Sequence, residues 1–313
     1  MDSPLLRKGL KLSHLRLMAA LDQTGQIGLA AAQMGVAQPA ASRLMAELER
    51  ITATPLTARD GRGLRMTPAG QALATRATRI LAEIGNAGAE TQDTGAGLRG
   101  HVRLGAVTAP ALDLVLPALR VARLSLPQVT VEVEVGTSDQ LAAQVLAGRL
   151  DFSLSRLPED ATPGTLTLRP IATEPVALVA RRGHFLTEPG PVDLTALMAQ
   201  DWILPGPGSP LRRAVLDRLA ALGLPAPRGQ LSTPSFLLTL AVLQQTNAVA
   251  PLASAVARQF AEGPGAACAV IPAGLEITVA AFGLLTRANT PLSPAAARLA
   301  ALVVPALAGP VLI

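Results

Sequence analysis

The segment Gln38–Arg50, QPAASRLMAELER, constrains the fold of this chain more than any other. Apolar residues recur through it and just beyond it at helical spacing, so they form one stripe. These residues are Ala41, Leu44, Leu48 and Ile51. Because proline is tolerated only in the first turn of a helix, Pro39 requires this helix to begin beside it. Upstream, residues 29–37 predict a shorter alanine-rich helix that ends in a turn at Gly35.

Two short helices joined by a tight glycine turn are typical of the helix-turn-helix, whose second helix enters the DNA major groove. On spacing alone, a helical hairpin without any DNA-binding role is an equal alternative. The net charge is +5, and residues 1–66 hold nine basic against five acidic residues, whereas residues 101–313 hold fifteen against fourteen. A basic excess beside the helix pair suits phosphate contacts, because charge kept for solubility would be spread more evenly.

A hairpin is predicted directly after the helix pair, within residues 55–67. Asp60-Gly61 and Gly63 mark a turn between two short extended pieces. Three cations lie on or beside its tip: Arg59, Arg62 and Arg65. The alternative is an ordinary solvated turn. After a helix-turn-helix, a wing that lies along the DNA backbone is favoured.

Hydroxyl residues predict the starts of two further helices, one capped by Ser13 and one beginning at Thr67-Pro68. The second helix carries a seam whose members step alternately by four and three residues. They are Leu73, Ala77, Ile80, Ile84, Ala87 and Thr91. The seam pairs with a second copy of the chain or packs on another domain, and pairing is preferred because dimers match two-fold symmetric DNA sites. We therefore expect a winged domain at 1–66, a linker helix at 67–94 and a hinge at 95–100.

From His101 the chain alternates strands and helices. Strands at 102–107, 129–135 and 151–155, with helices between them, predict a βαβαβ unit with parallel strands. Further strands are expected at 176–181, 202–204, 248–250 and 277–286.

Several helices of this region begin with a hydroxyl residue: Thr108, Ser138, Ser209, Thr233 and Ser293. In open α/β sheets, ligands lie beyond the carboxyl ends of the strands, where helix N-termini offer free N–H groups. Candidates to bind a carboxylate or a polyhydroxylated metabolite are therefore Thr108, Thr137, Ser138, Ser209 and Thr233. For each residue alone, a plain helix cap is the simpler interpretation. The only tryptophan, Trp202, lies on a strand expected to end at this crevice.

Residues 12–70 resemble the winged helix-turn-helix of the LysR-type transcriptional regulators. The matching signature is Ala31-Ala32, Gln38-Pro39-Ala40-Ala41-Ser42-Arg43, Leu48-Glu49, Pro55-Leu56, Arg59 and Thr67-Pro68-Ala69-Gly70. The remaining chain has the family's layout, so the resemblance covers nearly the full length. It implies that bases and adjoining phosphates are approached by Gln38, Pro39, Ser42 and Arg43.

The resemblance also implies a dimerising linker helix and a two-lobed α/β effector domain at 101–313, of the type 2 periplasmic-binding-protein-like architecture. Lobe 1 is expected at about 101–172 and 275–304, and lobe 2 at about 173–274. The chain would cross between them near 171–174 and return near 271–276. The implied partners are promoter DNA, a small-molecule inducer, RNA polymerase and further copies of the chain in a homodimer or homotetramer.

Three positions depart from the residues usual in the family. Ala37 replaces a serine that caps the recognition helix, Ala53 replaces a glycine, and Thr57 replaces an aromatic residue, commonly phenylalanine. Losing the serine cap costs about 1 kcal/mol. Losing a buried phenylalanine can cost about 3 kcal/mol or more. We therefore expect a less rigid DNA-binding domain.

Other classes of protein are disfavoured. The three histidines are scattered, and metal-binding, redox and nucleophile-elbow motifs are missing, so we expect no enzyme, no cofactor and no metal. A two-lobed solute-binding protein is the second alternative, but it would need an export signal and gives residues 12–94 no role. The single Cys268 fits a reducing compartment. Gly229–Ala257 carries no charge, but its apolar runs fall well short of the about 18 residues of a membrane span. We expect a cytoplasmic regulator that does not enter a membrane.

Overall fold

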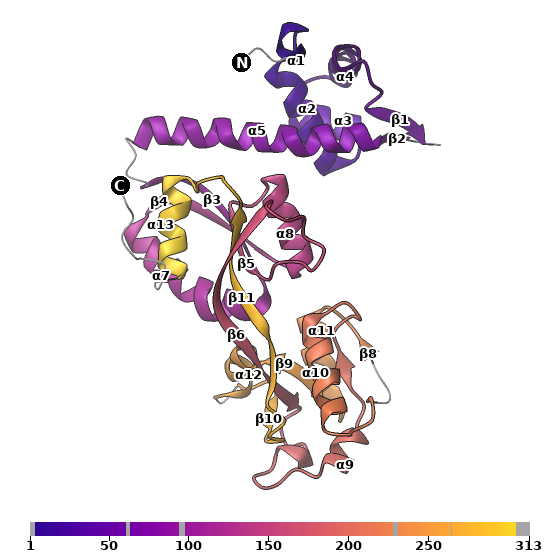
Figure 1. The fold of residues 1–313 in the computed structure, drawn as a ribbon, viewed down its shortest axis with the longest axis vertical. Coiled ribbons are helices and arrows are strands. Elements are labelled where there is room, and N and C mark those ends of the chain that lie inside the picture. Colours follow the sequence, from indigo (N-terminus) through magenta and orange to yellow (C-terminus); the bar gives the residue numbers. More distant parts are fainter. Residues whose placement is uncertain (1–3, 61–62, 94–97, 228–230, 264, 305–313) are drawn as a thin grey trace.

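The computed structural model of the 313-residue chain describes residues 4–60, 63–93, 98–227, 231–263 and 265–304. An N-terminal helical domain, one long helix and a two-lobed α/β domain follow one another along the longest axis (Figure 1). This order is the predicted one. We refer to the helical domain and the long helix together, residues 4–93, as the N-terminal unit.

The N-terminal domain holds the predicted helix pair and hairpin. Its elements are α1 (Pro4–Arg7), α2 (Leu12–Thr24), α3 (Ile27–Gln33), α4 (Gln38–Thr52), β1 (Thr57–Asp60) and β2 (Gly63–Met66). Gly35 has the positive φ of 69° that the predicted turn between α3 and α4 requires. The prediction that Ser13 caps α2 is wrong. The helix begins at Leu12, because Nδ1 of His14 accepts the backbone N–H of Lys11 at 3.1 Å and fixes the start there.

The long helix α5 (Pro68–Asp93) begins as predicted, because the Thr67 hydroxyl accepts the N–H of Gly70 at 3.1 Å. Gly70 lies so close to the segment before β1 that a Cβ there would be 2.0 Å from the carbonyl oxygen of Leu56. The first half of α5 packs along α2. The N-terminal core contains, among others, Leu17, Met18, Ala41, Met45, Leu48, Ala74 and Ala77.

One seven-stranded mixed sheet runs through both lobes of the α/β domain, in the order β10-β6-β11-β5-β3-β4, with β9 paired to β6. Its strands are β3 (Arg99–Ala106), β4 (Gln128–Val135), β5 (Phe152–Ser155), β6 (Leu166–Ala180), β9 (Ala250–Ala253), β10 (Ala269–Ile271) and β11 (Ile277–Arg287). The predicted parallel unit is confirmed, since β3 pairs in parallel with both β4 and β5. Strands β6 and β11 pair antiparallel to each other along most of their length.

Lobe 1 is built on β3, β4 and β5. Its helices are α6 (Thr108–Pro110), the π-helical η1 (Ala111–Val115), α7 (Leu116–Ser125), α8 (Ser138–Ala147) and α13 (Pro294–Val303). The core between α7, α13 and the sheet includes Val102, Leu104, Phe152, Leu154, Leu299 and Val303. Helix α13 begins as predicted, because the Ser293 hydroxyl accepts the N–H of Ala296 at 3.3 Å.

Lobe 2 is built on β9, β10 and the neighbouring halves of β6 and β11. Its other elements are η2 (Phe185–Thr187), α9 (Leu194–Met198), β7 (Ile203–Leu204), α10 (Pro210–Ala221), β8 (Leu231–Ser232), α11 (Phe236–Gln245) and α12 (Ser254–Ala261). Trp202 is fully buried in the core of this lobe, where its indole N–H donates to the carbonyl of Leu197 at 3.4 Å.

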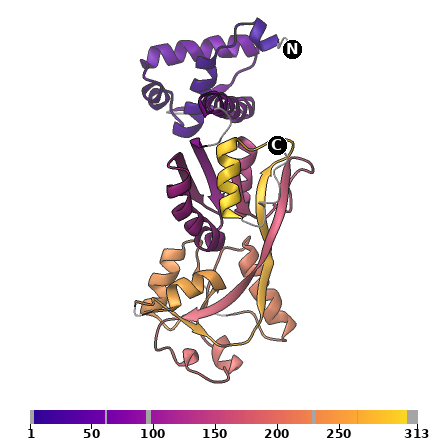
Figure 2. The same ribbon diagram turned by 90° about the vertical axis from the view of Figure 1, so that its left-hand side faces the viewer.

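Two long strands connect the lobes, and Figures 1 and 2 show them running side by side between the two bodies. The forward crossing follows β6 through residues 171–174, near the predicted place. The return crossing lies within β11, because Val279 pairs with Glu174 and Phe282 with Ala172. The prediction of a return at 271–276 is therefore wrong, since a β-strand partner and not a loop carries the chain back.

The uncharged stretch Gly229–Ala257 forms β8, α11, β9 and the start of α12 where it is described. Among the helices in the described part of the chain, none is both long enough and apolar enough to cross a membrane.

Candidate nucleic-acid interface and ligand cleft

The start of α4 presents one exposed polar face. Gln38, Pro39, Ser42 and Arg43 are all exposed there. The opposite face of α4 is buried through Ala41, Met45, Leu48 and Ile51. Leu44 of the predicted stripe is only half-buried, and Met45 takes its place in the core. The four predicted contact residues therefore lie together, free of the domain's own packing, as insertion into a groove requires.

The wing follows α4 as a two-stranded hairpin in which Thr57 pairs with Met66 and Arg59 with Leu64. Arg65 is exposed on β2. Arg62 and the side chain of Arg59 lie outside the described residues.

Glu49 joins the recognition helix to the wing, a role that sequence reasoning missed. Its Oε1 accepts the backbone N–H groups of Leu56 at 2.8 Å and Thr57 at 3.0 Å, and also the Thr57 hydroxyl at 3.0 Å. Three donors on one carboxylate oxygen fix the position of β1 against the last turn of α4. The signal in the sequence was the short separation between Glu49 and Pro55, which leads into the strand. A loop of this length can bring the two segments together.

Both ends of α4 show the predicted departures. Ala37 at the N-cap provides no side-chain hydrogen bond, and only its carbonyl accepts N–H groups of the first turn, those of Ala40 and Ala41. Ala53 ends the helix in the left-handed conformation with φ 52°. An alanine there is strained, because its Cβ crowds the backbone where glycine has none.

The seam of α5 divides between two environments. Ala77 is fully buried and Leu73 half-buried against the N-terminal core, so the prediction that they face a second copy of the chain is wrong. Ile80 and Ile84 are 43% and 46% exposed, and Ala87 is exposed as well. The apolar strip open to a partner is therefore the second half of the predicted seam; the side chain of Thr91 lies outside the described residues.

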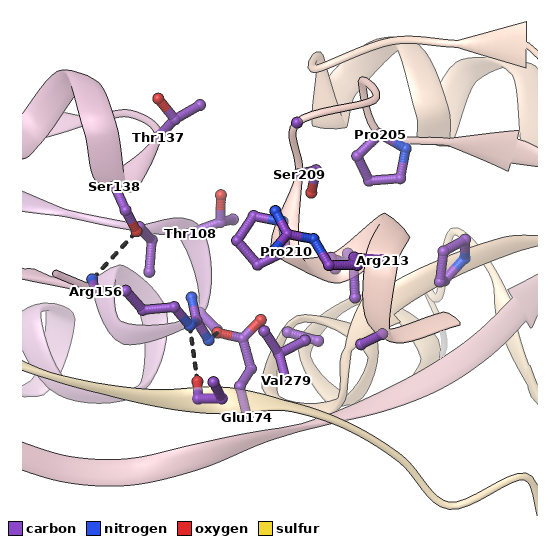
Figure 3. Close-up of a pocket in the computed structure, with 18 of the residues that line it drawn as sticks. Thr108, Thr137, Ser138, Arg156, Glu174, Pro205, Ser209, Pro210, Arg213 and Val279 are labelled. Carbon is purple, nitrogen blue, oxygen red and sulfur yellow. Dashed lines mark hydrogen bonds and ion pairs between the residues drawn. The ribbon is translucent and has the colours of Figure 1, made fainter. Parts of the chain in front are cut away.

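A cleft of about 1430 Å³ opens between the two lobes. All five hydroxyl residues proposed from the sequence line it. In Figure 3, Thr108, Thr137 and Ser138 approach from lobe 1, and Ser209, Pro210 and Arg213 from lobe 2. The strand that carries Trp202 ends at the cleft as predicted, through Ile203 and Pro205, while Trp202 itself is buried and is not among the lining residues.

The helix caps differ from the prediction at three places. Thr137, not Ser138, caps α8, through a reciprocal pair of hydrogen bonds with Gln140. Thr108 is the first residue of α6 and does not cap it. Ser235, not Thr233, caps α11, and the Thr233 hydroxyl accepts the N–H of Ser235 at 3.1 Å. Adjacent hydroxyl residues can each serve as a cap, so the local backbone decides between them.

Of the five predicted hydroxyls in the cleft, two have no hydrogen-bond partner among the described residues. Thr108 is exposed on lobe 1, and Ser209, at the N-cap of α10, makes no side-chain cap bond. By contrast, Ser138 accepts the N–H of Arg156 at 3.2 Å, and Thr137 and Thr233 accept backbone N–H groups. Thr108 and Ser209 are therefore the predicted hydroxyls most available to a ligand.

The charges of the cleft were not predicted, because their partners come together only across the crossing strands. Its arginines are each paired with a glutamate. Arg156 binds Glu174 at 2.9 Å on the crossing, with both side chains nearly buried. Arg218 lies 3.9 Å from Glu276, and Arg213 of lobe 2 pairs with Glu159 of lobe 1 across the opening.

Three more carboxylates line the cleft, Asp139, Asp160 and Asp217, so six acidic residues face three arginines. A ligand carboxylate would meet this negative excess without a free cation among the described lining residues. Of the two ligand classes expected from the sequence, the polyhydroxylated one suits the cleft better.

The histidines do not form a site. His14 is buried in the N-terminal domain and His184 in lobe 2, whereas His101 lies on β3. Nδ1 of His184 accepts the N–H of Leu186 at 3.2 Å, and burial lowers the pKa of this imidazole. Within the described residues, no group of three or more His, Cys, Asp or Glu side chains could hold a metal ion.

Two family models match this chain, one in its N-terminal part and one in its C-terminal part. The family model described as "LysR substrate binding domain" matches residues 95–308, and that described as "Bacterial regulatory helix-turn-helix protein, lysR family" matches residues 12–71. The HTH-type transcriptional regulator GbpR of Rhizobium radiobacter is 42% identical over 254 residues, which cover 80% of this chain and 84% of that protein.

Solved structures are similar over nearly the whole length. A full-length OxyR variant from Pseudomonas aeruginosa has a TM-score of 0.69 at 20% identity, covering 95% of this chain and 94% of its own. Full-length CbnR complexed with its target DNA has a TM-score of 0.53 at 25% identity, covering 94% and 98%.

Proposed function

Because the chain belongs to the LysR-type transcriptional regulators, we propose that α4 and the wing contact promoter DNA, and that the inter-lobe cleft binds an uncharged, hydroxyl-rich metabolite that controls transcription. The family consists of DNA-binding regulators and not of enzymes. The alternative of a solute-binding protein without a DNA function has no support.

The exposed start of α4 supports the DNA contacts. Gln38, Ser42 and Arg43 offer amide, hydroxyl and guanidinium groups on one face, and Pro39 holds the first turn close to the groove. Arg43 can donate two hydrogen bonds to a guanine or bind a phosphate. Arg59, Arg62 and Arg65 of the wing neutralise backbone phosphates, which adds affinity without sequence selection.

The effector contacts come from both lobes. Thr108 and Ser209 supply free hydroxyls from opposite walls, and Thr137, Ser138 and Thr233 add hydroxyls that can still donate. A ligand that binds both walls favours one relative position of the lobes, because it stabilises the state to which it binds better.

The oligomer pairs through α5. Ile80, Ile84 and Ala87 form an exposed apolar strip that a second copy of the strip can cover. The regulator acts in the cytoplasm, where promoter DNA lies, and contacts RNA polymerase there.

A thermal-shift screen tests the effector assignment, because a ligand that binds the folded state raises its melting temperature. The panel pairs neutral sugars and polyols with the corresponding sugar acids. We expect a neutral compound to stabilise the parent, and Thr108→Val and Ser209→Ala to reduce its affinity by about 0.5–1.5 kcal/mol each. Ser125→Ala, on the far end of α7, is the control. Stabilisation by the sugar acids alone would contradict the assignment.

A further inference from the structure

Helix α8 of lobe 1 and the crossing strand β11 each have one end in the cleft and the other against the N-terminal unit. Helix α8 begins at Thr137 and Ser138, which line the cleft. Strand β11 has its first five residues, 277–281, in the cleft wall. Figure 1 shows α5 lying across the opposite end of lobe 1 from lobe 2, beside the far ends of both elements.

At the far end of α8, Arg149 binds the N-terminal unit. Its guanidinium lies 3.3 Å from Oδ2 of Asp22 in α2. The Asp22 side chain is only 13% exposed, and its other oxygen accepts the side-chain amide of Gln71 in α5 at 2.5 Å. Asp22 therefore ties α2, α5 and lobe 1 together at one point.

The turn after α8 is fitted closely to α5. Gly148 has φ +72°, and a Cβ built on it would lie 2.6 Å from Cγ of Arg79. The backbone of lobe 1 thus approaches α5 more closely than a side chain at this position would allow.

At the far end of β11, Arg287 forms the second contact. Its side chain is 14% exposed, donates to the carbonyl of Val145 at 3.3 Å and lies 3.5 Å from Oε1 of Glu83 in α5. Because Val145 belongs to α8, this arginine links the two elements to each other as well as to α5.

We propose that lobe 1 is a docking surface for the chain's own N-terminal unit, and that this docking is coupled to the state of the cleft through α8 and β11. The proposal rests on the proposed function of the cleft as the effector site. A helix and a paired strand transmit displacement because they are stiff along their length. The Arg213–Glu159 pair spans the cleft from lobe 2 to lobe 1. In this proposal, docking of the N-terminal unit favours the state in which that pair is formed.

Such coupling is reciprocal, so a change at the docking surface must alter the cleft. We test it by hydrogen–deuterium exchange of the full-length chain without DNA or effector. Arg149→Glu places a carboxylate beside Asp22 and disfavours docking. Glu83→Gln is a milder second variant, at a side chain that is 59% exposed, and removes only the charge that faces Arg287.

For both variants we expect exchange in α2 and in the first half of α5 to become about fivefold faster or more, the lower end of typical coupling between sites. The cleft end of α8 lies about 15 Å along the helix from its end at the N-terminal unit. We expect faster exchange at the cleft as well, in peptides that cover Thr108 and Ser209–Arg213. The charge-swapped pair Asp22→Arg with Arg149→Glu should restore parental exchange at the cleft. Arg123→Glu, an exposed charge change on α7, should leave both regions unchanged.

Two results would overturn the proposal. Faster exchange confined to α2 and α5 would show docking without coupling to the cleft. Parental exchange everywhere in both variants would show that lobe 1 does not hold the N-terminal unit. Neither result bears on whether the cleft binds an effector or α4 binds DNA, so the proposed function would stand.

Discussion

Thr57 donates two hydrogen bonds to Oε1 of Glu49, one from its backbone N–H and one from its hydroxyl, each at 3.0 Å. The family's usual aromatic residue at this position would pack against apolar neighbours. This chain instead attaches the wing to α4 through a carboxylate. The departure at Thr57 therefore brings a polar contact that offsets part of the lost packing.

Removal of the Thr57 hydroxyl should lower the stability of the N-terminal domain. Thr57→Val keeps the shape of the side chain but removes one hydrogen bond to a charged acceptor, which should cost about 1.5–3 kcal/mol of unfolding free energy. Urea unfolding measures the loss. The matched control is Thr54→Val, an exposed hydroxyl whose removal should cost less than about 0.5 kcal/mol. Equal losses in the two variants would show that Glu49 does not hold the wing.

The strained end of α4 predicts a stabilising substitution. Ala53 has φ 52°, so Ala53→Gly should raise the unfolding free energy by about 0.5–1 kcal/mol. Ala46→Gly, in the exposed interior of the same helix, should instead lower it by about 1 kcal/mol. The same unfolding experiment compares them, and a loss of stability on Ala53→Gly would mean that the residue is not strained.

His184 predicts that stability falls in mild acid. Burial lowers the pKa of its imidazole below the usual 6.5, while the unfolded chain keeps the usual value. The unfolded state therefore binds the proton first, and stability decreases as the pH falls from about 6.5 toward the lower folded pKa. His184→Asn retains an acceptor for the N–H of Leu186 but cannot titrate.

Thermal unfolding between about pH 7.5 and 5.5 checks this point, because that range spans the usual imidazole pKa. We expect a smaller drop in melting temperature for His184→Asn than for the parent. A parental drop in His184→Asn would assign the acid sensitivity to other groups.

Substitution by aspartate should have different effects in the two halves of α5. Ile80→Asp puts a charge on the exposed strip, so it should dissociate the dimer while the chain stays folded. Ala77→Asp buries a charge in the N-terminal core and should unfold that domain. Light scattering gives the mass and circular dichroism the fold. An Ile80→Asp protein with the parental mass at micromolar concentration would remove this strip from the dimer contact.

Local signals predicted most of the helices and strands. Pro39 and Gly35 determine where α4 begins and where the turn before it lies, and the two positions are confirmed by the structure. Strand β6 was predicted only at its apolar end. Residues 166–175 contain two prolines, are exposed or half-exposed, and are held as a strand by β11. Such pairing depends on a segment far away in the sequence and leaves no mark in the local pattern.

The site was predicted in part for the same reason. The hydroxyls of the cleft follow strands in sequence, so Thr108 and Ser209 could be assigned from topology. The Arg156–Glu174 pair forms where β6 crosses between the lobes, and no sequence motif predicts it. Trp202 precedes the cleft in sequence but points into the core of lobe 2, because an indole gains more from burial than from the cleft wall.

The most direct test of the central claim is a gel-shift titration with a duplex selected by the parent protein from fragments of its own genome. Arg43→Ala should weaken binding to this duplex by about 1–3 kcal/mol, which is roughly 5- to 150-fold in Kd, with the oligomer mass unchanged. Arg123→Ala, on α7 far from the interface, should bind as the parent does. If Arg43→Ala bound the selected duplex with parental affinity, the exposed face of α4 would not be the surface that recognises DNA.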